Sequence, residues 1–156
     1  MGMWCMLASP LLMSADLRTI RPEYKAILLN KNLIELNQVG SISILRIKCQ
    51  FYTQDKLGQQ AKRIFRGWEI DVYKRELSPD NHGMNPVAVA FLNKNPSRTQ
   101  KASFRLADLG LNHAAGYQAT EIFSGEELGQ GHFKPYDILR HDVKPTGILL
   151  VKFVEK

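Results

Sequence analysis

Hydrophobic and polar positions change their spacing partway along the chain, near position 55. In the first part, the apolar run at 10–13 has the length of a buried strand, and a buried helix is expected before it. Pro22 stands where a helix can begin, and Tyr24, Ile27 and Leu28 follow at the i, i+3, i+4 spacing of one helix face. Positions 1–37 therefore predict helix, strand, helix and helix, which is α/β material.

Polar residues mark where the two later helices are expected to start. Arg21 precedes Pro22 and is a poor helix cap, since its side chain offers no short oxygen acceptor. Asn32 and Glu35 have capping-box spacing, which predicts a second short helix whose apolar residues are Leu33, Ile34 and Leu36.

Beyond position 55 the pattern is that of short strands. Trp68, Ile70 and Val72 alternate with acidic residues, as on a half-buried strand. Positions 86–94 are apolar on both parities, as on a strand buried on both faces, and further strands are expected at 102–106, 117–125, 133–143 and 147–155. Short strands separated by turn clusters predict an antiparallel β-sandwich.

Composition and charge narrow the function classes. The 156 residues carry a net charge of +6, with small basic clusters at 62–66 and 73–75. These clusters indicate solvated faces or strand edges, and no nucleic-acid-binding motif accompanies them. The apolar N-terminus is too short to span a bilayer, and no Lys or Arg precedes it as in a signal peptide. Cys5 and Cys49 form no metal-binding spacing, so no zinc site is expected. No cofactor is expected either.

Several motifs together resemble one enzyme family. The segment P-L-L-M-S-A-D-L-R at 10–18 is the most specific, and N-L-I-E-L-N-Q, D-K-L-G-Q-Q-A-K-R-I, V-A-V-A-F-L-N-K-N and V-K-P-T-G-I-L-L-V-K-F support it. They resemble the α-galactosidase and α-N-acetylgalactosaminidase family, glycoside hydrolase family 27, over nearly the whole chain except 39–54.

The resemblance implies a domain organisation. The family fold is a (β/α)₈ barrel followed by an antiparallel β-sandwich, and such a barrel alone takes about 250 residues. We therefore expect a mostly β chain, with the last strand and helices of a truncated barrel at 1–37, a non-family insertion at 38–54, and the sandwich at 55–156. The barrel remnant is expected to be loosely held, because apolar residues that face barrel neighbours would lack them: Trp4, Leu7, Leu11, Leu12 and Met13.

The resemblance also implies an activity for the full-length enzyme. The family hydrolyses terminal α-galactosidic bonds of glycoconjugates with two aspartates from earlier barrel strands, and retaining chemistry needs carboxyls about 5–5.5 Å apart. No catalytic, cofactor-binding or metal-binding residue is carried over to this chain, which is expected to be inactive alone. The resemblance also implies a homodimer and a lysosomal or secreted location, and it leaves galactose versus N-acetylgalactosamine open. The alternative is a stand-alone, non-catalytic β-domain that binds carbohydrate or protein.

Individual candidates for chemistry within the chain are weak. Asp16 follows the barrel-type strand and could lie at the catalytic end of a barrel, but a cap or an ion pair with Arg18 is favoured. Trp68 and Tyr136 could stack on a sugar, although aromatic residues at strand spacing are more often core. The remaining carboxylates are expected to be solvated, and the histidines share no metal-site spacing: Asp71, Asp80, Asp108, Glu126, Glu127, and His82, His113, His132, His141.

The insertion V-G-S-I-S-I-L-R-I-K-C-Q-F-Y-T-Q at 39–54 interrupts family-like sequence on both sides. It is rich in apolar, β-prone residues and has no polar turn cluster of its own, which is unusual for a functional surface loop. Valine codons begin with GT and a glutamine codon can end with AG, the two ends of a spliceosomal intron. We favour an in-frame retained intron, and a genuine β-hairpin inserted at the domain junction is the rival.

Sequencing mature transcripts across this junction distinguishes the two origins. We expect spliced messages in which the codons for residues 39–54 are missing. If every mature message contains them, the intron hypothesis fails.

Overall fold

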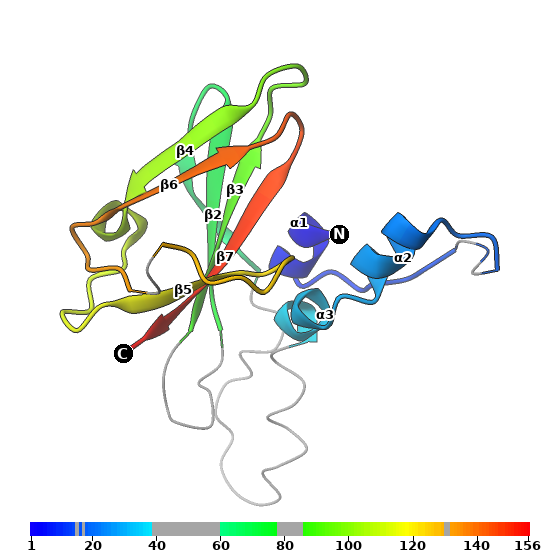
Figure 1. The fold of residues 1–156 in the computed structure, drawn as a ribbon, viewed down its shortest axis with the longest axis horizontal. Coiled ribbons are helices and arrows are strands. Elements are labelled where there is room, and N and C mark those ends of the chain that lie inside the picture. Colours follow the sequence, from blue (N-terminus) through cyan, green and yellow to red (C-terminus); the bar gives the residue numbers. More distant parts are fainter. Residues whose placement is uncertain (15, 17, 39–59, 78–85, 130–131) are drawn as a thin grey trace, which may run out of the picture.

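The computed structural model describes residues 1–14, 16, 18–38, 60–77, 86–129 and 132–156 (Figure 1). Helices come first in this part of the chain: α1 (Gly2–Met6), α2 (Pro22–Leu28) and α3 (Lys31–Gln38). Strands and one short 3-10 helix follow: β1 (Lys62–Arg66), β2 (Ile70–Glu76), β3 (Val87–Asn93), β4 (Gln100–Arg105), η1 (Leu106–Leu109), β5 (Tyr117–Glu121), β6 (Ile138–Val143) and β7 (Ile148–Glu155).

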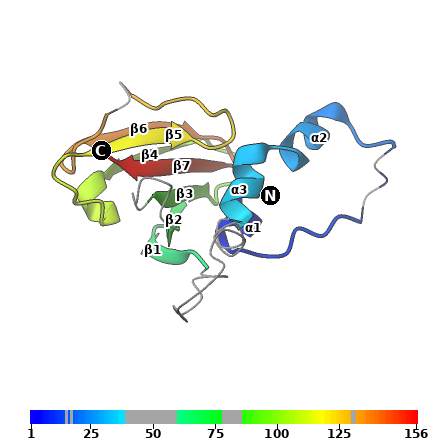
Figure 2. The same cartoon turned by 90° about the horizontal axis from the view of Figure 1, so that it is seen from below.

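The described strands form two antiparallel sheets. One has the order β1-β2-β3-β7-β5, and the other pairs β4 with β6. Figure 2 shows the β4–β6 layer along one face of the larger sheet. The predicted antiparallel sandwich is confirmed, with helices preceding it in the chain.

The apolar run of β3 is buried on both faces, as its sequence predicts. Val89 and Phe91 point into the core between the sheets, which also contains Phe153 from β7 and Leu139 from β6. Ala88 and Ala90 point to the opposite face of the sheet, where the helices pack. The sandwich therefore has two cores, one inside and one beneath its helices.

Two of the three helices pack against the outer face of the large sheet. Met6 of α1 and Leu33 of α3 are fully buried there against Leu150. Burying a side chain of this size contributes roughly 1.5–3 kcal/mol. Gly2 permits the close approach of α1, because an added Cβ would lie 2.9 Å from Leu150 Cδ1 and 3.1 Å from Phe123 Cζ.

A buried arginine joins these helices to β2. Arg75 Nη1 donates hydrogen bonds to the backbone oxygens of Cys5 at 2.7 Å and Leu36 at 3.0 Å. Both acceptors lie in the last turn of a helix, where a positive charge is favourable, and the Cys5 oxygen also accepts from Ala8 N at 3.2 Å. Burial lowers the pKa of the Arg75 guanidinium from its ordinary value.

The expected buried strand at 10–13 is wrong. No described residue pairs with this segment, and Leu12 and Met13 are 88% and 52% exposed. A strand needs a neighbour to satisfy its backbone groups, and the described part of the chain supplies none. The remnant is thus divided. α1 and α3 pack on the sandwich, and the expected loss of neighbours holds for Trp4 on the outer side of α1 and for Leu12 and Met13, which are exposed, but not for Leu7 and Leu11, which are half-buried.

The helix starts follow the predictions in part. α2 begins at Pro22, and its preceding residue makes no side-chain cap, as expected. The cap of α3 is Asn30, whose Oδ1 accepts from Leu33 N at 3.1 Å, so the proposed Asn32 cap is wrong. Asn32 instead donates its Nδ2 to the Ile122 oxygen at 3.1 Å, because its side chain faces the sandwich.

The strand around Trp68 also begins later than predicted. Gly67 N donates to the Ile70 oxygen at 3.0 Å, and this turn places Trp68 before the strand with 95% of its surface exposed. The basic cluster at 62–66 is an edge strand, as one of its two readings predicted. The described residues do not include the insertion at 39–54 or two of the candidates named above, Asp80 and His82.

Replacing Arg75 with alanine should lower the free energy of unfolding by about 3 kcal/mol, because two buried helix carbonyls lose a charged donor. Urea denaturation followed by circular dichroism measures the change. Arg105→Ala removes the same charge from an exposed strand position and should stay within about 0.5 kcal/mol of wild type. Equal effects of the two substitutions would contradict the role of Arg75.

Candidate functional site

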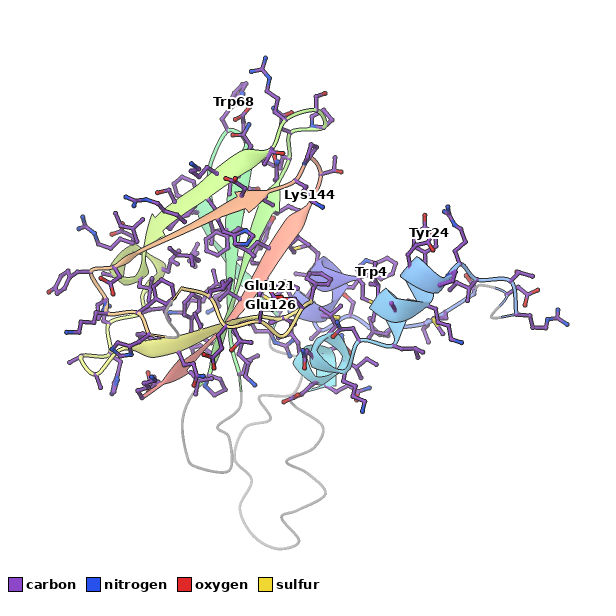
Figure 3. The ribbon with its side chains drawn as sticks, viewed as in Figure 1. Trp4, Tyr24, Trp68, Glu121, Glu126 and Lys144 are labelled. Carbon is purple, nitrogen blue, oxygen red and sulfur yellow. The ribbon has the colours of Figure 1, made fainter. Side chains whose placement is uncertain are left out.

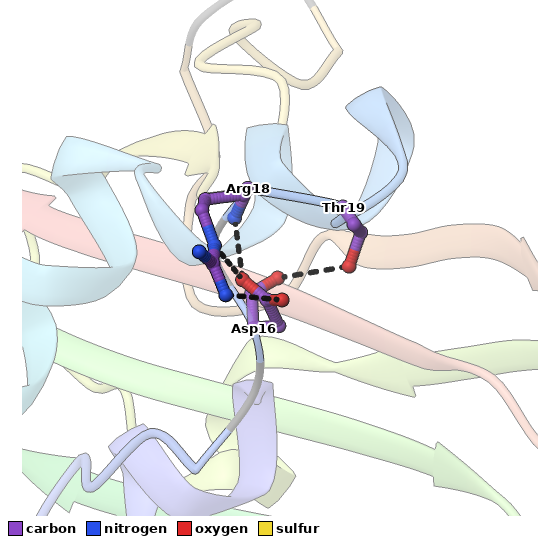
Figure 4. A network of polar contacts seen from close by, with 3 residues as sticks. All are labelled: Asp16, Arg18 and Thr19. Atoms are coloured by element: carbon purple, nitrogen blue, oxygen red, sulfur yellow. Dashed lines mark hydrogen bonds and ion pairs between the residues drawn. The ribbon is translucent and has the colours of Figure 1, made fainter.

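Asp16, which follows the family-like segment 10–13, is paired with a neighbouring arginine. Asp16 Oδ1 accepts from Arg18 N at 3.0 Å and Nε at 3.1 Å, and Oδ2 accepts from Nη2 at 3.2 Å (Figure 4). The Thr19 hydroxyl donates to the Asp16 carbonyl at 3.5 Å. The favoured interpretation, an ion pair with Arg18, is confirmed.

This pairing has a defined electrostatic effect. Hydrogen bonds from the Arg18 side chain, and secondarily from its backbone N–H, hold the pKa of Asp16 below its ordinary value. A general acid needs a raised pKa so that it carries a proton at working pH. Asp16 does not show the raised pKa of a general acid, and its carboxylate is paired with the Arg18 guanidinium.

Asp71 is buried, so its predicted solvated position is wrong. Its strand position on β2 turns the carboxylate towards two cations, with Lys94 Nζ 2.9 Å from Oδ1 and Arg63 Nη1 3.5 Å from Oδ2. The aliphatic stems of these long side chains can shield the carboxylate from water while their charges compensate it. Asp71 thus joins β1 to the segment after β3 through its ion pairs with Arg63 and Lys94.

Other carboxylates lie in turns or on the surface. Asp108, Glu126 and Glu127 are exposed, as predicted. Glu121 and Glu126 lie near each other (Figure 3), because the Glu121 backbone N–H donates to the Glu126 backbone oxygen at 2.8 Å across a turn. The Glu121 carboxylate accepts from Phe123 N at 3.1 Å and Ser124 N at 2.6 Å, so it caps this turn.

Two hollows in the described surface were candidates for a ligand site. The first, of about 280 Å³, lies between α3 and the strands β5 and β7, and its one carboxylate, Glu35, lies 3.9 Å from Lys152 Nζ. The second, of about 430 Å³, contains Asp137, which accepts from Lys134 N at 2.7 Å. Each hollow has a single carboxylate, whereas retaining glycoside hydrolysis needs two.

The histidines and aromatic candidates do not assemble into a site. Within the described ranges, no three His, Cys, Asp or Glu side chains gather as a metal site would require. His113 and His141 are exposed and His132 is half-buried. Trp68 and Tyr136 are 95% and 80% exposed, so the core interpretation of these aromatic residues is wrong.

Comparison with known proteins gives the family. The family model described as alpha galactosidase A matches residues 1–39, and the model of the alpha galactosidase C-terminal beta sandwich domain matches residues 67–153. The chain belongs to the α-galactosidase family. The two matches lie on α1–α3 and on the sandwich, and the resemblance read from the motifs is confirmed.

Relatives in this family are longer than the chain. Alpha-N-acetylgalactosaminidase of Gallus gallus is 31% identical over 96% of this chain and 32% of its own length, and alpha-galactosidase A of Homo sapiens is 29% identical over 97% and 31%. The chain thus spans about a third of these relatives. The α-galactosidase structure from Saccharomyces cerevisiae has a TM-score of 0.72 at 16% identity, covering 99% of this chain and 42% of the other. Among the described residues, no helix is long and apolar enough to span a membrane.

The Asp16 carboxyl should titrate below the ordinary value of 3.8, and Arg18→Ala should return it to that value. The folded pKa is depressed, so the stability from this pair is present above the ordinary pKa and is lost as pH falls through the lowered one. NMR titration of the side-chain carboxyl carbon measures both variants. Arg140→Ala, at an exposed arginine on β6, should leave the Asp16 pKa unchanged. An Asp16 pKa at or above 3.8 in wild type would contradict the pairing.

Proposed function

We propose that this chain is the C-terminal part of a retaining glycosidase that hydrolyses terminal α-galactosidic bonds of glycoconjugates. The observation that carries the proposal is the pair of family matches at 1–39 and 67–153, which follow the order of barrel end and sandwich. We divide the chain into a barrel remnant at 1–37, an insertion at 38–54 and a sandwich at 55–156. In the full-length enzyme the sandwich would then support a barrel that performs the reaction.

The chain by itself is proposed to be inactive. Asp16 is paired with Arg18, and each described hollow contains one carboxylate. The retaining mechanism requires a nucleophile and an acid on opposite sides of the scissile bond, about 5–5.5 Å apart. This arrangement would have to come from an upstream barrel.

Further properties are proposed from the family relationship. We place the full-length protein in the lysosome or outside the cell, as a homodimer. Either galactose or N-acetylgalactosamine fits the relatives, whose names contain both alpha-galactosidase and alpha-N-acetylgalactosaminidase. A stand-alone β-domain that binds carbohydrate or protein is the second candidate, and the exposed Trp68 favours it.

The purified chain should not release chromophore from a chromogenic α-galactoside above the buffer blank, because each described hollow contains one carboxylate where the mechanism needs two. Asp16→Asn should leave this result unchanged. Turnover that Asp16→Asn abolishes would overturn the proposal of inactivity.

A chimera tests the role of the chain in a complete enzyme. The barrel of the Gallus gallus relative, joined upstream of this chain with and without residues 39–54, should hydrolyse the substrate of that relative. A folded chimera without turnover in either form would contradict the proposal. The isolated barrel, made without this chain, is the matched control.

A further inference from the structure

Three loops form one end of the sandwich and are tied together by hydrogen bonds. We call residues 66–69, 94–99 and 144–147 the loop end. Lys94 Nζ donates to the Gly67 oxygen at 2.8 Å, Thr146 N donates to the Asn95 oxygen at 3.0 Å, and Asn93 Nδ2 donates to the Lys144 oxygen at 3.0 Å. The loop end is thus a connected platform, since each loop is bonded to another or to the end of β3.

Trp68 projects from this platform. Trp68 lies in the turn that the Gly67 N to Ile70 oxygen hydrogen bond closes. This tight turn requires glycine at position 67, because an added Cβ would lie 2.5 Å from the Ile70 oxygen. The side chain is 95% exposed, and Figure 3 shows Trp68 at the tip of the sandwich. A large indole so exposed makes almost no contact within the chain, and its apolar surface is available to a partner.

Every exposed charged residue of the loop end is a cation: Arg66, Lys94, Arg98 and Lys144. The one acidic residue, Glu69, is half-buried and accepts from Asn95 Nδ2 at 2.8 Å. Asp71, directly below, is buried and paired with Lys94. Arg66, Arg98 and Lys144 have no carboxylate partner among the described residues, so the platform presents these three cations together with one protruding indole.

We propose that the loop end docks onto an anionic lipid bilayer, with Trp68 in the interfacial region and Arg66, Arg98 and Lys144 at the lipid headgroups. Indole rings favour the membrane–water interface, because one part of the ring is apolar and the N–H remains hydrated. Basic residues near an anionic surface add attraction that falls off within a Debye length. This contact requires no catalytic site and goes beyond the glycosidase proposal.

The polar contacts of the loop end favour a lipid surface over a neutral sugar. Sugar hydroxyls are often bound by side-chain amide oxygens, but the amide oxygens at the loop end already have backbone partners. Asn95 Oδ1 accepts from Ser97 N and Arg98 N, both at 2.9 Å, and Asn93 Oδ1 accepts from Asn95 N at 2.8 Å. A single exposed ring also differs from the series of aromatic side chains on which nucleic-acid bases stack.

Fluorescence of the full chain tests the contact. The chain contains two tryptophans, so Trp4→Phe leaves Trp68 as the sole emitter. Vesicles of phosphatidylcholine with phosphatidylserine should shift its emission to the blue, and brominated lipid should quench it. Vesicles of phosphatidylcholine alone should have much less effect, and added salt should weaken the response.

Sedimentation with the same vesicles measures partitioning of variants. Arg98→Gln and Lys144→Gln should each lower the partition coefficient about fivefold, and Trp68→Ala should lower it further. Tyr136→Ala and Lys134→Gln are matched controls. Both residues precede β6, whereas Lys144 of the loop end follows it, so these changes should leave the partition coefficient unchanged. Thermal melts establish that each variant is folded. Arg98→Gln keeps the test valid should Trp68→Ala not fold, because Arg98 contributes only backbone groups to the platform.

Three outcomes would overturn the proposal. These are equal binding to neutral and anionic vesicles, unchanged binding of the loop-end variants, or no binding to vesicles. Binding of heparin or a neutral oligosaccharide through Trp68, in the absence of vesicle binding, would assign the loop end to a glycan instead.

Discussion

The packing of this chain depends on one buried guanidinium. Arg75 lies on β2, on the outer face of the large sheet, and donates hydrogen bonds to the last-turn carbonyls of both α1 and α3. A buried charge is costly unless it is compensated, and here partial negative charges at two helix ends provide compensation. The same contact closes the apolar cluster of Met6, Leu33 and Leu150. Without this contact, short helices such as α1 should unfold, because isolated helices of this length are unstable in water.

This interaction divides the N-terminal third of the chain into two kinds of structure. α1 and α3 belong physically to the sandwich, although the family match assigns 1–39 to a different model from 67–153. Segment 10–13 and α2 lie between α1 and α3 in the sequence, and no residue of α2 is buried. A barrel that supplied neighbours for these apolar surfaces would bury them, which fits the proposal that the chain completes a larger enzyme.

The sequence predicted the sandwich well because its strands carry strong local signals. Apolar residues on both parities of β3 indicated burial on both faces, and the structure places the inner core on one side and helices on the other. The failures have a common cause in tertiary context. The segment 10–13 reads as a strand but has no described partner, and Asn30 rather than Asn32 caps α3 because the Asn32 amide bonds the sandwich. No local pattern could show that Arg75 or Asp71 would be buried, since long-range neighbours bury them.

The sequence motifs predicted mainly which residues would not be catalytic, because no catalytic residue of the family could be assigned to this chain. The pairing of Asp16 with Arg18 followed from their spacing, whereas the exposure of Trp68 depended on the Gly67 turn, which strand alternation concealed. The central claim is that α3 and the sandwich form one cooperative unit through Arg75. Native-state hydrogen exchange of the backbone amides tests it most directly. The account predicts that the amides of Leu36 in α3 and Val89 in β3 open with the same free energy, equal to that of global unfolding. An opening of α3 at much lower free energy, while β3 stays protected, would contradict the account.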